Sequence, residues 1–132
     1  MRVARFALLA SLALLLASCN GSNIGTFDPG TYSTDPATAT YAPALNVDIA
    51  SMTKSTTGLY TKDLTVGTGV TATAGYTARV NYTGWLTNGT KFDTSEGKSP
   101  GYFEFLMNAG QVIKGWDEGV RGMKVGGKRQ LV

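Results

Sequence analysis

The sequence contains no histidine and only one cysteine, Cys19. Without imidazole groups the chain can form neither a histidine-dependent catalytic triad nor a zinc site built from nitrogen and sulfur ligands. A single cysteine also forms no disulfide within the chain and leaves no thiol for catalysis beyond position 19. The remaining chemistry is packing, hydrogen bonding and carboxylates, and we expect no metal and no other cofactor.

Charge is also sparse, because only 16% of the residues are Asp, Glu, Lys or Arg and the formal net charge is +3. Two of the 12 basic residues, Arg2 and Arg5, lie in the N-terminal segment, so ten basic residues face nine acidic ones in the rest of the chain. Binding to phosphate groups needs clustered positive charge, so we expect no nucleic-acid partner. The length of 132 residues and the 42% hydrophobic content fit one domain with additional segments.

No hydrophobic run is long enough to cross a bilayer, which takes roughly 20 residues. The longest run, residues 6–16, follows Arg2 and Arg5 and is largely apolar. A basic start followed by a short apolar run is typical of an export signal. We therefore predict a signal peptide over residues 1–18.

The end of this run, Leu16-Ala17-Ser18-Cys19, resembles the lipobox of bacterial lipoproteins. The resemblance implies that the Cys19 thiol carries a diacylglycerol and that Cys19 becomes the first residue of the mature protein. Several acyl chains would anchor the protein stably to a membrane. The alternative is an ordinary cleavable signal with an incidental cysteine.

A segment rich in Gly, Ser, Thr, Ala and Asp follows from residue 20 to about residue 44, broken by Pro29, Pro36 and Pro43. We predict a lipid-anchored flexible linker over residues 19–55, with a strand that docks on the domain as the alternative. A flexible tether over residues 20–44 has an end-to-end distance of roughly 25 to 30 Å. Residues 46–52 fit either a short strand or a helical turn.

The remaining residues alternate between strand signals and turn signals. Residues 58–66 predict one strand, and residues 76–86 predict a second strand with one face toward a core. Asn88-Gly89 predicts a two-residue hairpin turn of type I′, because both positions of that turn need positive φ. A polar loop over residues 95–101 and an extended segment over residues 102–107 follow. The residues predicted on the inner face of the second strand are Ala78, Val80, Tyr82, Gly84 and Leu86.

A short helix of about two turns is predicted by the spacing of Ile113, Trp116 and Val120, which share one helical side. Asp117 and Glu118 lie in its first turns, where negative charge suits the helix dipole, and Gly122 suits the position after its end. Another strand begins at residue 128. This order predicts an α+β fold, an antiparallel β-sheet wrapped over one short α-helix.

Four segments of this region resemble the FK506-binding (FKBP-type) family of peptidyl-prolyl cis-trans isomerases. They are Tyr82-Thr83-Gly84, Lys91-Phe92-Asp93, Val112-Ile113-Lys114-Gly115-Trp116 and Met123-Lys124-Val125-Gly126-Gly127-Lys128-Arg129. The resemblance covers roughly residues 56–132. It implies an FKBP-like fold and an isomerase of X-Pro peptide bonds that works without a cofactor.

The same resemblance implies a pocket with Trp116 as the floor under a substrate proline ring. Its implied catalytic residues are Tyr82, Phe92, Asp93 and Trp116, and its implied substrate-binding residues are Phe103, Val112 and Ile113, with the Ile113 N–H holding a substrate carbonyl. Taken singly, each aromatic residue also fits plain core packing, as we expect for Phe105. Taken singly, Asp93 fits a solvent-side turn or an ion pair with Arg79.

In the family, a loop with a further pocket tyrosine and a central last strand follow the strand that begins here at residue 128. Neither follows in this sequence. We therefore expect the domain over residues 56–132 to be incomplete at its C-terminus. The chain is then either a fragment of a longer, active isomerase or a prematurely ended gene product, which would be an inactive fragment. A domain of about 60 residues is already marginal in the surface that it buries, so the activity of this chain is an open question.

Three functions compete at this point. The first is an exported, monomeric isomerase of proline-containing polypeptides, lipid-anchored in the bacterial cell envelope. Asn20 follows Cys19 in place of an aspartate, which by resemblance to enterobacterial sorting rules favours the outer membrane. The second is a non-enzymatic, membrane-tethered chaperone or binding module. The third, sugar binding through Trp85 and Trp116, is disfavoured because strand alternation places Trp85 opposite Tyr82. The family resemblance also implies FK506-like macrolides as ligands.

Overall fold

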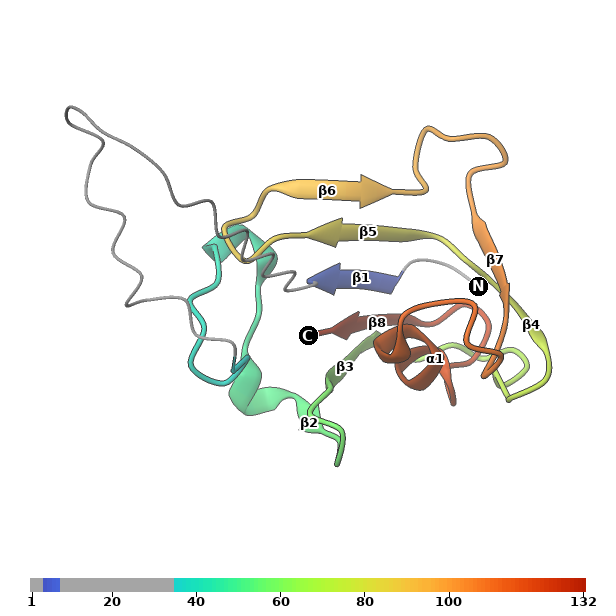
Figure 1. Cartoon of the computed structure of the whole chain (residues 1–132), viewed down its shortest axis with the longest axis horizontal. Helices are drawn as coiled ribbons and strands as arrows, with labels where there is room; N and C mark the ends of the chain where they lie inside the picture. The colour runs from blue at the N-terminus through green and yellow to red at the C-terminus, as the bar shows by residue number, and fades with distance from the viewer. Residues whose placement is uncertain (1–3, 8–34) are drawn as a thin grey trace, which may run out of the picture.

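The computed structural model describes residues 4–7 and 35–132 (Figure 1). Within these residues one sheet has six strands in the order β2-β3-β8-β1-β5-β6, and a second sheet pairs β4 with β7. The strands of the larger sheet are β1 (Ala4–Ala7), β2 (Thr53–Lys54), β3 (Tyr60–Thr65), β5 (Tyr82–Trp85), β6 (Lys91–Thr94) and β8 (Lys128–Leu131). The smaller sheet consists of β4 (Thr77–Val80) and β7 (Phe103–Leu106).

One α-helix, α1 (Lys114–Val120), contacts β8 and connects the smaller sheet to the last strand of the larger one. The pairs β2–β3, β3–β8, β4–β7 and β5–β6 are antiparallel. The predicted α+β class with one short helix is therefore confirmed. In Figure 1 the β4–β7 pair stands at one end of the larger sheet, and α1 lies in front of β3 and β8.

Strand β1 pairs in parallel with both of its neighbours, β5 and β8. Its four residues belong to the segment predicted as a signal peptide. The rest of that segment, and Cys19 with it, lies outside the described residues. Among the residues that are described, no helix is long and apolar enough to cross a membrane.

The strand predicted over residues 76–86 is interrupted at Asn81 and contributes β4 and β5 to two different sheets. Ser95 satisfies the backbone at this break, because its N–H donates to the Tyr82 carbonyl and its hydroxyl oxygen accepts from the Tyr82 N–H, both at 3.0 Å. The inward face is confirmed in β4, where Ala78 and Val80 are buried. The strand is interrupted because its two halves pair with different strands, β4 with β7 and β5 with β6.

The hairpin predicted at Asn88-Gly89 is present, but its predicted turn type is wrong. Gly89 alone of the pair has positive φ, at 89°, whereas a type I′ turn needs two such residues. The Gly89 N–H donates to the Leu86 carbonyl at 2.9 Å, and the Leu86 N–H donates to the Thr90 carbonyl at 2.8 Å. The Asn88 side-chain oxygen instead accepts from the Thr90 N–H at 2.9 Å, so the connection is a longer turn closed by a glycine bulge.

Residues 35–55 lie against the domain, although they belong to the segment predicted as a flexible linker. The Ala42 N–H donates to the Thr87 carbonyl at 2.7 Å, and the Gln130 amide donates to the Leu45 carbonyl at 2.9 Å. The segment forms two 3-10 helices, Pro43–Leu45 and Ile49–Ser51, so the question left open for residues 46–52 is decided for a helical turn. Residues 20–34 lie outside the described part of the chain.

The core of the domain consists of two clusters that share Trp116. The first surrounds Phe105, Met107 and Val120, and the second surrounds Leu131. Phe105 is buried, which confirms the prediction of a core position. Gly122 stands at the predicted C′ position, after the extended Arg121 that ends α1, and has φ of 79°. Because Trp116 packs against both clusters, the helix and the sheet hold this side chain from two sides.

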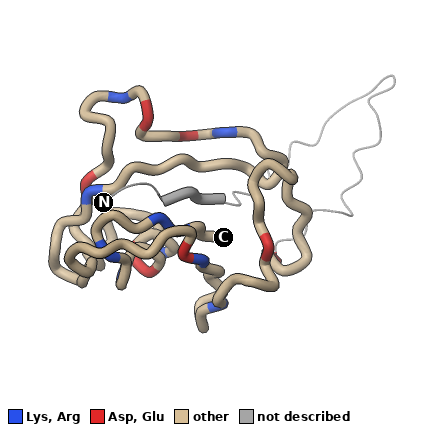
Figure 2. The backbone as a smooth tube through the Cα atoms, turned by 180° about the vertical axis from the view of Figure 1, so that it is seen from behind, with Lys and Arg blue, Asp and Glu red and all other residues tan. Residues whose placement is uncertain are grey.

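Basic and acidic residues are interspersed along the described backbone, without a long stretch of one sign (Figure 2). Three pairs lie within ion-pair distance, Arg79–Glu104 at 2.8 Å, Lys98–Asp93 at 2.5 Å and Arg129–Asp63 at 2.6 Å. The first two pairs lie on the surface, where ion pairs stabilise a fold little. The third has a largely buried guanidinium, which also donates to the Gly119 and Arg121 carbonyls.

Candidate active site

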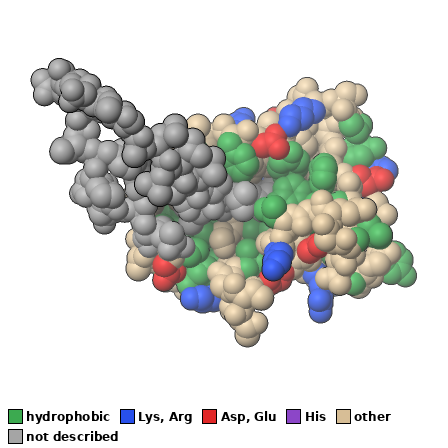
Figure 3. All heavy atoms as spheres, viewed as in Figure 1, with side chains coloured by type: hydrophobic (Ala, Val, Ile, Leu, Met, Phe, Trp, Pro, Cys, Tyr) green, Lys and Arg blue, Asp and Glu red, His purple; other side chains and the backbone are tan. Residues whose placement is uncertain are grey.

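A cavity of about 550 Å³ opens between α1, β5, β6 and β7. Its size lies within the range of small-molecule sites. In the space-filling view, hydrophobic side chains gather at the centre of the face that is shown, with charged side chains around them (Figure 3). Ten residues line the cavity: Tyr82, Gly84, Phe92, Asp93, Phe103, Gly110, Gln111, Val112, Ile113 and Trp116.

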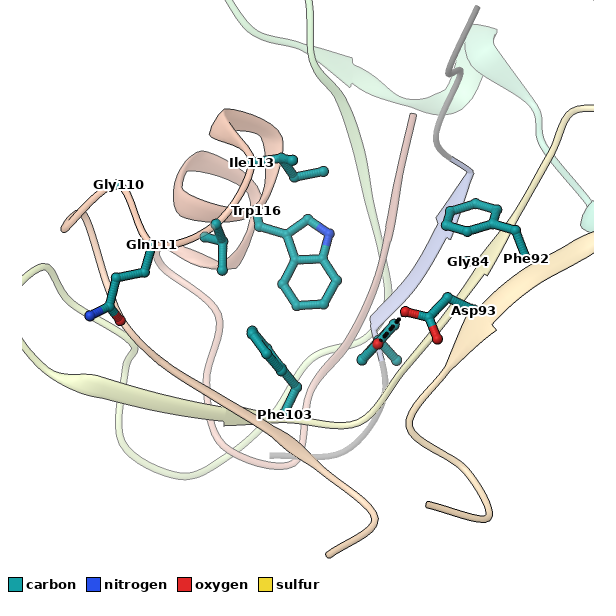
Figure 4. A pocket seen from close by; sticks show the side chains of 10 residues that line it. Gly84, Phe92, Asp93, Phe103, Gly110, Gln111, Ile113 and Trp116 are labelled. Carbon is teal, nitrogen blue, oxygen red and sulfur yellow. Dashed lines mark hydrogen bonds between the residues drawn. The ribbon is translucent and has the colours of Figure 1, made fainter. Parts of the chain in front are cut away.

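The Trp116 ring projects from the first turn of α1 into the middle of this cavity (Figure 4). Its centroid lies 4.9 Å from that of Tyr82 and 5.6 Å from that of Phe103, and both pairs are edge-to-face. Behind it, Phe105 lies at 5.9 Å. Edge-to-face pairs at these separations are favourable and directional, so three rings from two sheets hold the indole in one orientation.

A polar group stands at one side of this apolar cavity. The Tyr82 hydroxyl donates to Asp93 Oδ2 at 2.6 Å, and Lys98 Nζ donates to Asp93 Oδ1 at 2.5 Å. The pKa of Tyr82 is raised to about 12, mainly by burial and to a smaller extent by the hydrogen bond to Asp93. The pKa of Asp93 is lowered, mainly by the hydrogen bond from Lys98 and to a smaller extent by the hydrogen bond from Tyr82. At neutral pH the carboxylate is therefore charged and the phenol protonated.

The ion pair considered for Asp93 with Arg79 is not the one that forms. Arg79 pairs with Glu104 across the β4–β7 ladder, where the two residues stand opposite each other. Lys98, from the loop between β6 and β7, takes the place at Asp93. Sequence spacing could not distinguish these partners, because the register of β4 against β7 decides which carboxylate faces Arg79.

The mouth of the cavity is apolar and open to solvent. Phe92, Phe103 and Ile113 are 48%, 39% and 46% exposed, respectively. Ile113 precedes α1 with φ of −59° and ψ of 146°, and its N–H donates to no acceptor among the described residues. The mouth therefore offers apolar surface and one backbone donor to a ligand.

All seven residues predicted for catalysis and substrate binding line this one cavity. Cys19, predicted as the lipidation site, lies outside the described residues. Three lining residues were missed, namely Gly84, Gly110 and Gln111. Gly84 could have been found from the sequence, because strand alternation places it on the same face as Tyr82. In the structure a Cβ at this position would stand 2.5 Å from the Phe92 ring, so only glycine leaves room for that ring. Gln111 gave no such signal.

No group of three or more Asp, Glu, His or Cys side chains in the described part of the chain is arranged to hold a metal ion. Within the cavity, Asp93 contributes the one carboxylate, and it is already engaged by Tyr82 and Lys98. The arrangement offers an apolar slot with a charged and hydrogen-bonded rim. It can bind and orient an apolar group, and it contains no free acid, base or nucleophile pair.

Comparison with known proteins places this geometry in a family. The model of the FKBP-type peptidyl-prolyl cis-trans isomerase family matches residues 69–132. An FK506-binding protein of Neisseria meningitidis serogroup B is 53% identical over 75 residues, which cover 56% of this chain and 67% of that protein. The chain belongs to the FKBP-type peptidyl-prolyl cis-trans isomerase family. The resemblance predicted from the four sequence segments is thereby confirmed.

Other FKBP-type proteins match the same region. FK506-binding protein 4 of Rhizopus delemar is 44% identical over 80 residues, which cover 61% of this chain and 20% of that protein. The crystal structure of AtFKBP13 superposes with a TM-score of 0.54 at 38% identity, over 61% of this chain and 68% of that one. The FKBP-like fold is therefore confirmed, while the chain spans about two thirds of the bacterial relative and a fifth of the fungal one.

Proposed function

We propose that this protein catalyses the cis-trans isomerisation of X-Pro peptide bonds in exported polypeptides. The observation that carries the proposal is the cavity itself, which is lined by Tyr82, Phe103 and Trp116, three rings that pack edge to face at interplanar angles of 72° to 85°. A proline ring is apolar and rigid, so it loses little conformational freedom when it enters such a slot. Family membership supports the same activity.

The reaction needs no acid, base or nucleophile, which agrees with what the cavity contains. Resonance keeps the peptide bond planar, and rotation crosses a barrier of about 18 to 20 kcal/mol. The twisted amide of the transition state is less conjugated and less dipolar than the planar one. An apolar slot that excludes water therefore favours the transition state over the ground state.

Two polar features of the site orient the substrate. The Ile113 N–H stands at the mouth without an acceptor among the described residues, and we assign it to a carbonyl of the bound peptide. The Tyr82 hydroxyl is held by the charged Asp93, which in turn is held by Lys98. This chain of hydrogen bonds fixes the rim of the pocket, so that the proline enters in one orientation.

The cellular place of the activity rests on the sequence pattern of residues 1–19 alone. We propose that Cys19 is lipidated and that the domain works in the bacterial cell envelope, on the periplasmic side of the outer membrane, as a monomer. The interspersed charges (Figure 2) support a protein without a nucleic-acid partner. Metabolic labelling with a radioactive fatty acid tests the anchor. Label should appear in the wild type and be lost in Cys19→Ala.

The activity is tested by NMR exchange spectroscopy on a short peptide with an apolar residue before proline. The wild-type chain should accelerate the exchange between cis and trans signals. Tyr82→Leu removes one wall of the cavity and should abolish most of the acceleration. The matched control is Tyr76→Leu, the same exchange at a residue that is 71% exposed and outside this cavity.

The same samples distinguish the competing functions. An FK506-like macrolide should compete with the peptide, because we propose that both occupy the cavity. Acceleration that is equal in Tyr82→Leu and Tyr76→Leu would show that the cavity is not the site. Peptide binding by the wild type without any acceleration would replace the isomerase by a binding module.

A further inference from the structure

One wall of the cavity is a loop, residues 107–112, that connects β7 to α1. Gly110, Gln111, Val112 and the adjoining Ile113 line the cavity along this loop. In the close-up view, the Gln111 side chain points away from Trp116, so the loop contributes its backbone and its apolar side chains to the wall (Figure 4). The position of this loop decides how wide the slot is.

The loop has an unusual backbone for a segment without regular structure. Asn108 has φ of 61° and Gly110 has φ of 67°, so two of the three residues 108–110 adopt the left-handed region. Residues other than glycine populate this region weakly unless their surroundings hold them there. The conformation therefore depends on contacts that the loop makes with its neighbours.

Asp117 supplies two of these contacts from the first turn of α1. Its Oδ1 accepts from the Asn108 N–H at 2.8 Å, and its Oδ2 accepts from the Gly110 N–H at 3.3 Å. A carboxylate that accepts from two backbone donors makes charge-assisted hydrogen bonds, which are stronger than neutral ones. A third contact, from the Leu106 N–H to Gln111 Oε1 at 2.9 Å, closes the base of the loop.

Asp117 directly follows Trp116, whose ring is the centre of the cavity. The same helical turn therefore carries the floor and anchors the wall. We propose that Asp117 is a positioning residue, whose carboxylate holds the loop of residues 107–112 in the conformation that receives the substrate. The proposal rests on the proposed function, because it assigns the wall a role in binding a proline-containing peptide.

If only a fraction of the molecules has the loop in the binding conformation, the apparent dissociation constant equals the intrinsic one divided by that fraction. The reaction of the peptide once it is bound does not change. Asp117→Ala removes both hydrogen bonds and should therefore raise KM for the peptide at least tenfold, because one hydrogen bond to a charged group already corresponds to about that factor. The value of kcat should stay within about twofold, because Trp116 and the Ile113 N–H still act on the bound peptide. Asp117→Asn keeps one acceptor oxygen and should lie between the wild type and Asp117→Ala.

The control is Glu118→Gln on the same helical turn, whose carboxylate accepts from the Thr57 hydroxyl instead of the loop. KM for this variant should stay at the wild-type value. The second readout is amide hydrogen exchange, measured on the full chain without peptide. Exchange at Asn108 and Gly110 should be faster in Asp117→Ala than in the wild type, and unchanged in Glu118→Gln.

Unchanged exchange at Asn108 and Gly110 in both Asp117 variants would overturn the anchoring. Faster exchange with an unchanged KM, or a loss confined to kcat, would overturn the role in substrate binding. If the wild type neither binds nor turns over the peptide, the proposed function fails and takes the substrate role with it, whereas the exchange data still decide the anchoring. Should Asp117→Ala not fold, the Asn variant carries the same comparison.

Discussion

Helix α1 contains two glycines that should respond to the same substitution in opposite directions. Gly115 and Gly119 both have ordinary helical backbone angles, so alanine is allowed at either position. A Cβ on Gly119 would stand 2.5 Å and 2.7 Å from the two methyl carbons of Leu131, which is buried. A Cβ on Gly115 would stand 3.6 Å from the nearest atom, a methyl carbon of Leu59, at ordinary contact distance.

The expected magnitudes follow from these distances. Gly115→Ala should raise the free energy of unfolding by about 0.4 to 1 kcal/mol, because alanine restricts the unfolded chain and favours the helix. Gly119→Ala gains the same amount but overpacks the interior at a cost of about 1 to 3 kcal/mol. Because its clash involves several atoms of a buried side chain, we expect a net loss of about 1 to 2 kcal/mol. The two variants should differ by about 1.5 to 3 kcal/mol.

Urea unfolding of the full chain, followed by tryptophan fluorescence, measures both values, and an unchanged slope would show that the comparison is fair. Since Leu131 packs against Trp116, Gly119→Ala should also weaken peptide binding, whereas Gly115→Ala should leave it intact. A Gly119→Ala variant at least as stable as the wild type would refute the packing argument. Equal losses in both variants would contradict it as well, because they would point to the helix backbone instead of Leu131.

Three further results are expected. Lys98→Met removes the largest cause of the lowered pKa of Asp93. The pH at which peptide affinity falls on acidification should therefore rise in this variant, toward the ordinary carboxyl pKa near about 4. Identical pH profiles in the variant and the wild type would show that Asp93 does not contribute to binding. Tyr82, with its pKa raised to about 12, should contribute stability below about pH 10 and lose it as the pH rises through about 12, and Tyr82→Phe should remove this dependence in alkaline unfolding curves. Arg129→Met breaks the pair with Asp63 and two bonds to carbonyls, and with partial solvent screening it should lower the free energy of unfolding by about 1 to 2 kcal/mol.

The sign of the Asp93 effect follows from linkage. A carboxylate with a lowered pKa in the folded state stabilises that state above its unfolded pKa, and this contribution is lost as the pH falls through the folded value. Because the pKa of Asp93 lies below its ordinary value, the carboxylate stays ionised from about pH 5 to 8, and the peptide affinity of the wild type should be constant over this range. Lys98→Arg should behave like the wild type because it retains the positive partner. A wild-type affinity that changes between these values would contradict the assignment.

Much of the fold was predictable from local pattern. The spacing of Trp116 and Val120 predicted the helix, and Gly122 marked its end, because helical periodicity and left-handed glycine act within a few residues of chain. Strand signals located the segments of β3, β5, β7 and β8. The pairing that splits residues 76–86 between two sheets was not predictable, because it depends on which distant strands lie beside each half.

The candidate site shows the same division. The residue types Tyr82, Phe92 and Trp116 came from the sequence, through segments that resemble the FKBP-type family. Their convergence in one cavity, and the exchange of Arg79 for Lys98 as the partner of Asp93, came from the register of the strands and the path of the loop between β6 and β7. Local pattern carries no information on either.

The sequence by itself determined that the chemistry uses no imidazole and little charge, that an apolar N-terminal run precedes the domain, and that one short helix accompanies several strands. These are properties of residue type and local spacing. Tertiary structure alone decided that residues 35–55 dock on the domain, that Gly119 faces the buried Leu131 side chain and that the Asp117 carboxylate accepts two hydrogen bonds from the pocket loop. Each of these depends on a contact between groups that only folding brings within a few ångströms, and such contacts leave no periodic trace in the chain.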